Sequence, residues 1–158
     1  MSTADARDLA LFLHLLGVVA LTAGIAIAAV AHARARREES AEGVVVLLRL
    51  ARTGVLLAAP AALVVVGAGA WLVGIEDLGW DTGWLRSAIA VFVLSLVLGA
   101  AGGRRPRQAR ELAERLRADG QPPNDALRAL LDDRASLLAN VASGIAMLVV
   151  LWLMVAKP

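Results

Sequence analysis

The chain has 158 residues, of which 59% are hydrophobic and only 19% are charged, and its mean hydropathy is +0.69. This apolar share exceeds that of a soluble domain, so the composition excludes a water-soluble globular fold. The absence of cysteine excludes disulfides, thiolate metal sites and cysteine nucleophiles. The length fits one domain over residues 1–158.

Four stretches carry no charged residue: 9–33, 53–75, 87–103 and 135–156. A transmembrane helix needs about 20 apolar residues, because the hydrocarbon core is about 30 Å thick and a helix rises about 1.5 Å per residue. The third stretch reaches this length if Trp84 and Leu85 join it, with Arg86 extending its guanidinium toward the interface. The sequence therefore predicts an all-α up-and-down bundle of four transmembrane helices over about 9–33, 53–75, 84–103 and 135–156.

The first stretch could alternatively be a secretory signal, since Ala31-His32-Ala33 looks like a cleavage site. Its apolar run is longer than the roughly 7 to 15 residues of a signal peptide, and Asp5 and Asp8 precede it with Arg7. We therefore expect this helix to be retained.

The positive charges predict the orientation of the bundle. The first and third connections hold thirteen of the sixteen Lys and Arg residues: Arg34, Arg36, Arg37, Arg49, Arg52, Arg104, Arg105, Arg107, Arg110, Arg115, Arg117, Arg128 and Arg134. The second connection instead holds Glu76, Asp77 and Asp81. Because positive residues stay on the cytoplasmic side, both of these connections are expected there and both termini outside.

The third connection contains a predicted short amphipathic cytoplasmic helix over residues 107–118, ended by Gly120 and the two following prolines. Asn124 then caps a second helix, which we expect to continue into the fourth span. The net charge is +2 and the isoelectric point is near 10.3. Since acidic residues are interleaved with the arginines, we expect these connections to attract anionic lipid headgroups and not nucleic acid.

Small residues recur on the predicted spans, with Gly24 at the centre of such a face on the first. Small faces let helix backbones approach closely in lipid, and they are compatible with a homo-oligomer as well as with packing inside one chain. Pro60 lies well inside the second span, where it removes a backbone hydrogen bond and is expected to kink the helix.

The polar residues within the spans are few: His14, Thr22, Ser95, Asn140 and Ser143, with His32, Arg52 and Arg86 at the edges. No span contains an acidic residue, which disfavours a proton-coupled pump or a cation channel. The sequence also lacks a phosphate-binding glycine loop, a nucleophile elbow and a His-x-x-x-His pair, so no catalytic residue is predicted.

His14 has two possible roles. Its imidazole could bind haem or copper, or it could form a hydrogen bond to a neighbouring helix, which is the role we favour. The other histidine, His32, lies about 27 Å further along the same helix at about 1.5 Å per residue, so the two cannot share one ion. No metal site or cofactor is therefore predicted, and haem or copper on His14 remains the alternative.

Asn140 and Ser143, with Ser136 one turn earlier, form a polar stripe on the fourth span. Interhelical hydrogen bonds are the favoured explanation for this stripe and for Arg86, and a substrate site is the alternative.

The segments LFLHLLGVVALTAG, RTGVLLAAPAALVVVGAGAWL, WLRSAIAVFVLSLVLG and LMVAKP together resemble the bacterial membrane proteins of domain-of-unknown-function family 2269. The most specific pieces are His14, the segment from Thr53-Gly54 to Pro60, and the closing Lys157-Pro158. The resemblance covers nearly the whole chain and implies a four-helix membrane protein with no assigned reaction.

The sequence is also loosely similar to four-helix haem-binding protoporphyrinogen oxidases and to copper-resistance type D proteins, which carry an early helical histidine. It departs from the oxidases after His14, where Val19, Ala20, Leu21 and Thr22 replace a tryptophan and bulky aromatic residues, and it contains no tyrosine. This departure counts against a bound cofactor.

Together these features predict a non-enzymatic structural or interaction module in the bacterial cytoplasmic membrane. Two alternatives remain: a haem- or copper-binding protein that uses His14, and a small oligomeric transporter or channel subunit.

Overall fold

The computed structural model describes residues 2–157, so Met1 and Pro158 lie outside the described residues, including the last residue of the Lys157-Pro158 motif. The described chain is helical throughout apart from short connections, and its helices are α1 (Thr3–Ala35), α2 (Ala41–Ile75), α3 (Gly83–Gly102), α4 (Arg104–Ala118), α5 (Asp125–Leu131) and α6 (Arg134–Ala156).

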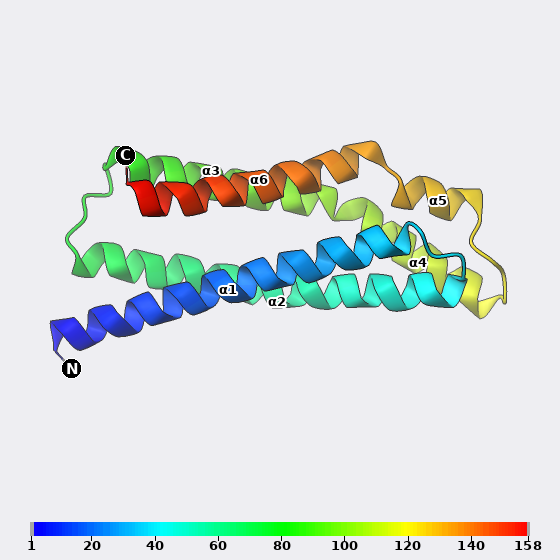
Figure 1. The fold of residues 1–158 in the computed structure, drawn as a ribbon, viewed down its shortest axis with the longest axis horizontal. Coiled ribbons are helices and arrows are strands. Elements are labelled where there is room, and N and C mark those ends of the chain that lie inside the picture. The colour runs from blue at the N-terminus through cyan, green and yellow to red at the C-terminus, as the bar shows by residue number, and fades with distance from the viewer. Residues whose placement is uncertain (1, 158) are drawn as a thin grey trace.

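The helices form two antiparallel pairs, α1 with α2 and α3 with α6, which lie side by side along the length of the molecule (Figure 1). The two ends of the chain and the α2–α3 turn lie at one end of the bundle, and the α1–α2 turn, α4 and α5 lie at the other (Figure 1). Four helical segments are long and apolar enough to cross a membrane. The predicted four-helix up-and-down membrane bundle is thus confirmed.

The first two helices extend well beyond the predicted spans. Ser40 begins α2 by accepting a hydrogen bond at its hydroxyl from the N–H of Gly43 at 3.0 Å, so the residues from 41 to 52 are helical instead of forming a loop. With 35 residues, α2 is about 50 Å long at about 1.5 Å per residue, which exceeds the hydrocarbon thickness of about 30 Å. Arg49 and Arg52 therefore lie on α2 beyond its charge-free part.

The segment between α3 and α6 differs from the prediction of one short amphipathic surface helix. Gly103 alone separates α4 from α3, and α4 buries Ala109, Ala113 and Leu116 against the neighbouring helices. The helix that Asn124 caps ends at Leu131, and Asp132 and Asp133 interrupt its predicted continuation into α6. The reason is that Asp133 caps α6, since its carboxylate accepts the N–H of Ser136 at 2.9 Å.

At the end of the bundle that carries α4 and α5, side chains from four helices form one buried group, which we call the cap cluster. Its members are Ala35 of α1, Ala41, Val44, Val45 and Leu48 of α2, Ala109, Ala113 and Leu116 of α4, and Leu127 and Leu131 of α5. The α2 members follow helical spacing, which places them on one face. The cap cluster is thus built as the core of a soluble domain is.

Between the two helix pairs lies a second group, which we call the central cluster: Leu21, Ala61, Ala62, Phe92, Met147 and Val150. Most other large apolar side chains of the four long helices point outward; Leu63, for example, is 75% exposed and Leu138 is 69% exposed. In a membrane protein these side chains face lipid.

Candidate functional site

The backbones of α1 and α2 approach each other closely at Gly24 and Gly54. A Cβ atom on Gly24 would lie 2.5 Å from the carbonyl oxygen of Gly54, and one on Gly54 would lie 2.5 Å from that of Gly24. The two backbones therefore touch with no room for a side chain on either. Further along the same pair of helices, Gly17 and His14 of α1 also lie against Val65 of α2.

His14 lies on α1 and faces α2. Its Nδ1 is 3.0 Å from the carbonyl oxygen of Val65, and the ring packs over Gly69, where a Cβ atom would lie 3.3 Å from Cε1 and Nδ1. A carbonyl oxygen only accepts, so Nδ1 carries the proton and donates. With the Nδ1 proton donated in this way, Nε2 is the ring atom that is left for a second partner.

His32 lies in the last turn of α1, next to the α1–α2 turn. Its ring is partly buried, and its Nδ1 is buried without a hydrogen-bond partner among residues 2–157. Within the same residues no three His, Cys, Asp or Glu side chains are grouped closely enough to hold a metal ion.

The polar stripe on α6 faces α3. Ser143 donates its hydroxyl to the carbonyl oxygen of Ser95 at 2.8 Å, and Ser95 donates to the carbonyl oxygen of Ser143 at 3.2 Å. Asn140 lies about one turn and Ser136 about two turns closer to the cap cluster than Ser143 does. Both side chains donate to the carbonyl oxygen of Gly102, with Asn140 at a distance of 3.3 Å. Gly102 has no space for a side chain because the amide of Asn140 fills it. These four side chains therefore join α3 to α6.

Two other residues singled out from the sequence lie on the surface. Pro60 is exposed inside α2, and the kink expected there stays a prediction. Arg86 is exposed on the first turn of α3, and its side chain makes no hydrogen bond or ion pair to another residue of the described chain. Nearby, the Nζ of Lys157 lies 5.5 Å from the centroid of the Trp84 ring.

Local sequence patterns do not identify the polar contacts that join the helices around the cap cluster. Arg128 of α5 donates to two carbonyl oxygens of the α1–α2 turn, those of Arg36 at 2.9 Å and Glu38 at 2.6 Å. Arg36 pairs with Asp132 at 2.7 Å, and Arg49 of α2 pairs with Glu114 of α4 at 3.3 Å. The partners are 65 to 96 residues apart, so no local pattern could identify them, although the number of arginines in both connections was a signal.

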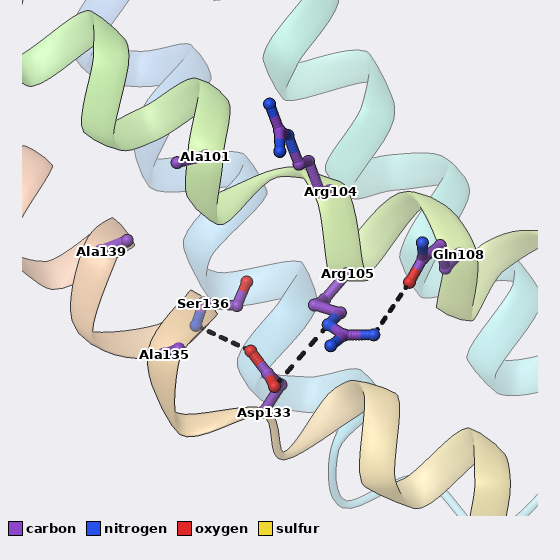
Figure 2. A pocket seen from close by; sticks show the side chains of 8 residues that line it. All are labelled: Ala101, Arg104, Arg105, Gln108, Asp133, Ala135, Ser136 and Ala139. Atoms are coloured by element: carbon purple, nitrogen blue, oxygen red, sulfur yellow. Dashed lines mark hydrogen bonds and ion pairs between the residues drawn. The ribbon is translucent and has the colours of Figure 1, made fainter.

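Two hollows lie on the α6 side of the bundle. One, of about 460 Å³, lies where α3 passes into α4 and α6 begins, and arginine, glutamine, serine and alanine residues line it (Figure 2). The other, of about 370 Å³, lies between α1 and α6 and is apolar apart from Thr22. The hydroxyl of Thr22 already donates to the carbonyl oxygen of Val18 at 2.8 Å, so the second hollow offers little polar recognition.

The long apolar helices, their outward-facing leucine and valine side chains and their interhelical hydrogen bonds define an integral membrane protein. The chain belongs to the family described as predicted integral membrane protein (DUF2269), whose match covers residues 8–158. No curated protein and no solved structure matches the chain significantly.

Proposed function

We propose that this chain is a non-enzymatic structural or interaction module of the bacterial cytoplasmic membrane. The observation that supports this proposal is that polar side chains within the apolar helices are used for packing: His14 donates to α2, and Ser95, Ser143 and Asn140 join α3 to α6. Side chains used in this way hold the bundle together and are not presented to a substrate.

The experiment compares two substitutions of His14 in the full chain, purified in a mild detergent. His14→Gln keeps an N–H donor for the carbonyl oxygen of Val65, whereas His14→Leu removes it. If His14 is structural, the thermal stability of His14→Gln stays closer to that of the unchanged protein than does that of His14→Leu, and none of the three proteins has a Soret band or stoichiometric copper. A bound cofactor that both substitutions remove would contradict the proposal.

One observation favours a second function, haem or copper binding at His14. The hydrogen bond from Nδ1 leaves the lone pair on Nε2, and backbone-anchored neutral histidine is the form that commonly binds metals. The same purified protein decides this case, since haem on His14 gives a visible spectrum that His14→Gln abolishes. A third function, as a subunit of an oligomeric transporter or channel, needs self-association and would show as an oligomer in detergent.

The proposed orientation has both termini outside and the cap cluster in the cytoplasm. The uneven distribution of arginine supports it, and so does the position of both termini at the end of the bundle opposite the arginine-rich α4 (Figure 1). A cysteine at the exposed Asp81 should react with a membrane-impermeant thiol reagent in intact cells, whereas one at the exposed Gln121 should not. The opposite labelling pattern would show that the protein has the opposite orientation, with both termini in the cytoplasm.

A further inference from the structure

The hollow where α3 passes into α4 and α6 begins has two chemically distinct sides (Figure 2). One side is formed by three small side chains, Ala101 of α3 and Ala135 and Ala139 of α6. The other is polar and includes Arg104, Arg105 and Gln108 of α4. A ligand that fits this hollow therefore has an anionic part and an adjacent less polar part that packs against the alanine methyl groups.

The hollow lies at the level where both helices leave the apolar part of the bundle. Arg104 is the first charged residue after the charge-free stretch 87–103, and Arg134 is the last one before the stretch 135–156. On the charge-free stretches themselves, Val97 and Leu138 are exposed. The arginines of the hollow are thus at the boundary between hydrocarbon and headgroups, where lipid phosphates lie.

The single carboxylate of the hollow, that of Asp133, already has two partners. One oxygen of Asp133 accepts the N–H of Ser136 at 2.9 Å, and the other lies 3.7 Å from Nε of Arg105. Arg105 also donates from Nη1 to Oε1 of Gln108 at 3.3 Å, so Figure 2 shows its guanidinium fixed between two partners. Arg104, turned away from this pair in Figure 2, has no ion pair within residues 2–157. The hollow is thus lined by two arginines and one carboxylate, so it keeps a net positive charge.

We propose that this hollow binds one anionic phospholipid, with the headgroup phosphate on Arg105 and on Arg104, whose exposed side chain turns toward the hollow to reach it. The glycerol region then lies over the three alanines and the acyl chains run along α3 and α6. The planar guanidinium matches the oxygens of a phosphate, and the fixed position of Arg105 lowers the entropy lost when the phosphate binds. This site is independent of whether His14 binds a cofactor.

The test measures how phosphatidylglycerol changes the thermal unfolding midpoint of the full chain in a neutral detergent, because a ligand that binds only the folded state raises that midpoint. We expect phosphatidylglycerol to raise it and neither phosphatidylcholine nor inorganic phosphate to do so. The combined substitution Arg104→Gln, Arg105→Gln should weaken the apparent affinity for phosphatidylglycerol about 30-fold, since two basic contacts are lost.

The matched control is Arg115→Gln with Arg117→Gln, which removes the same charge from exposed positions further along α4. This control should weaken binding less than threefold, and equal weakening by both pairs would show a general charge attraction and overturn the site. An equal effect of inorganic phosphate would overturn the lipid as the ligand.

A second pair of variants keeps every charge. Ala101→Leu fills the small side of the hollow, whereas Ala100→Leu adds the same group at an exposed neighbour outside it. Only Ala101→Leu should weaken phosphatidylglycerol binding. Identical binding by these two variants would overturn the proposal even if the double arginine variant does not fold.

Discussion

The cap end and the apolar part of the bundle differ in which side chains they bury. The cap cluster includes large side chains, and Leu127, Leu131, Val44 and Val45 are almost fully inaccessible. In the apolar part glycine, alanine and serine lie at the α1–α2 and α3–α6 contacts, while most leucines and valines point outward. Water drives large apolar groups into a core, but lipid does not, so close backbone approach and hydrogen bonds hold the membrane helices together.

The largest effect is expected at the α1–α2 crossing. Gly24→Leu places a side chain where a Cβ atom alone would lie 2.5 Å from the carbonyl oxygen of Gly54. Because the obstacle is backbone, the helices must separate, and we expect the free energy of unfolding to fall by more than about 3 kcal/mol. Thermal unfolding in detergent measures this loss. The control is Gly74→Leu on α2, where the added atom meets open space and stability should hold. Equal stability of the two variants would contradict the assigned contact.

In the cap cluster, Leu127→Ala should lower the free energy of unfolding by about 2 to 3 kcal/mol, because it leaves a cavity at a fully buried position. Leu138→Ala removes the same atoms from a side chain that is 69% exposed to lipid and should change stability little. Chemical unfolding of both variants in detergent tests this difference directly. Equal losses of unfolding free energy in the two variants would show that the cap cluster is not packed like the core of a soluble domain.

The next effect concerns the attachment of α5 to the α1–α2 turn. Arg128→Met keeps much of the side-chain volume but leaves the carbonyl oxygens of Arg36 and Glu38 without their donor, for a loss of about 1 to 2 kcal/mol. Hydrogen exchange should then accelerate in α5 before it changes in α3 or α6. Arg115→Met at an exposed position of α4 serves as the control. The same acceleration of exchange in this control would show that the hydrogen bonds of Arg128 do not hold α5 to the α1–α2 turn.

Ser143→Ala tests the hydrogen bonds within the apolar part. It removes the donor to the carbonyl oxygen of Ser95, and the expected loss is about 0.6 to 1 kcal/mol, as for other interhelical hydrogen bonds in membranes. Ser87→Ala is the matched control, since the hydroxyl of Ser87 bonds only within α3, to Gly83. Differential scanning calorimetry should give Ser143→Ala a lower unfolding temperature than Ser87→Ala, and equal temperatures would contradict a stabilising role of the Ser143 hydroxyl.

The smallest effect is a pH dependence at the α1–α2 turn. Hydrogen bonds from the hydroxyl and N–H of Ser40 to the carboxylate of Glu38 hold the pKa of Glu38 below its ordinary value. A lowered folded-state pKa gives stability that is present above the unfolded-state value and is lost as the pH falls through the folded-state value. Glu38→Gln should therefore flatten the acid side of the stability profile slightly, and an unchanged profile would show that these bonds do not persist in solution.

Local patterns predicted the four apolar helices well, because charge-free length and hydropathy depend only on neighbouring residues. They failed at residues 41–52, which were assigned to a connection although Ala41, Val44, Val45 and Leu48 follow helical spacing. Arg49 and Arg52 give this segment the charge that is typical of a connection between spans, although its apolar residues have the spacing of a helix. The interruption at Asp132 and Asp133 also differs from the predicted continuous helix, although its signal is local: Asp133 caps α6 by accepting the N–H of Ser136 three residues later.

The sequence by itself determined that this chain is a four-helix membrane protein, since burying so many apolar residues in a bilayer needs no knowledge of their partners. Only the tertiary structure decided that Gly24 meets Gly54, that His14 donates to Val65, and that Arg105 and Asp133 form one wall of a hollow. Each of these contacts joins different helices. In a bilayer such pairings depend on the fit of small surfaces and on single hydrogen bonds, and hydropathy carries no information about either.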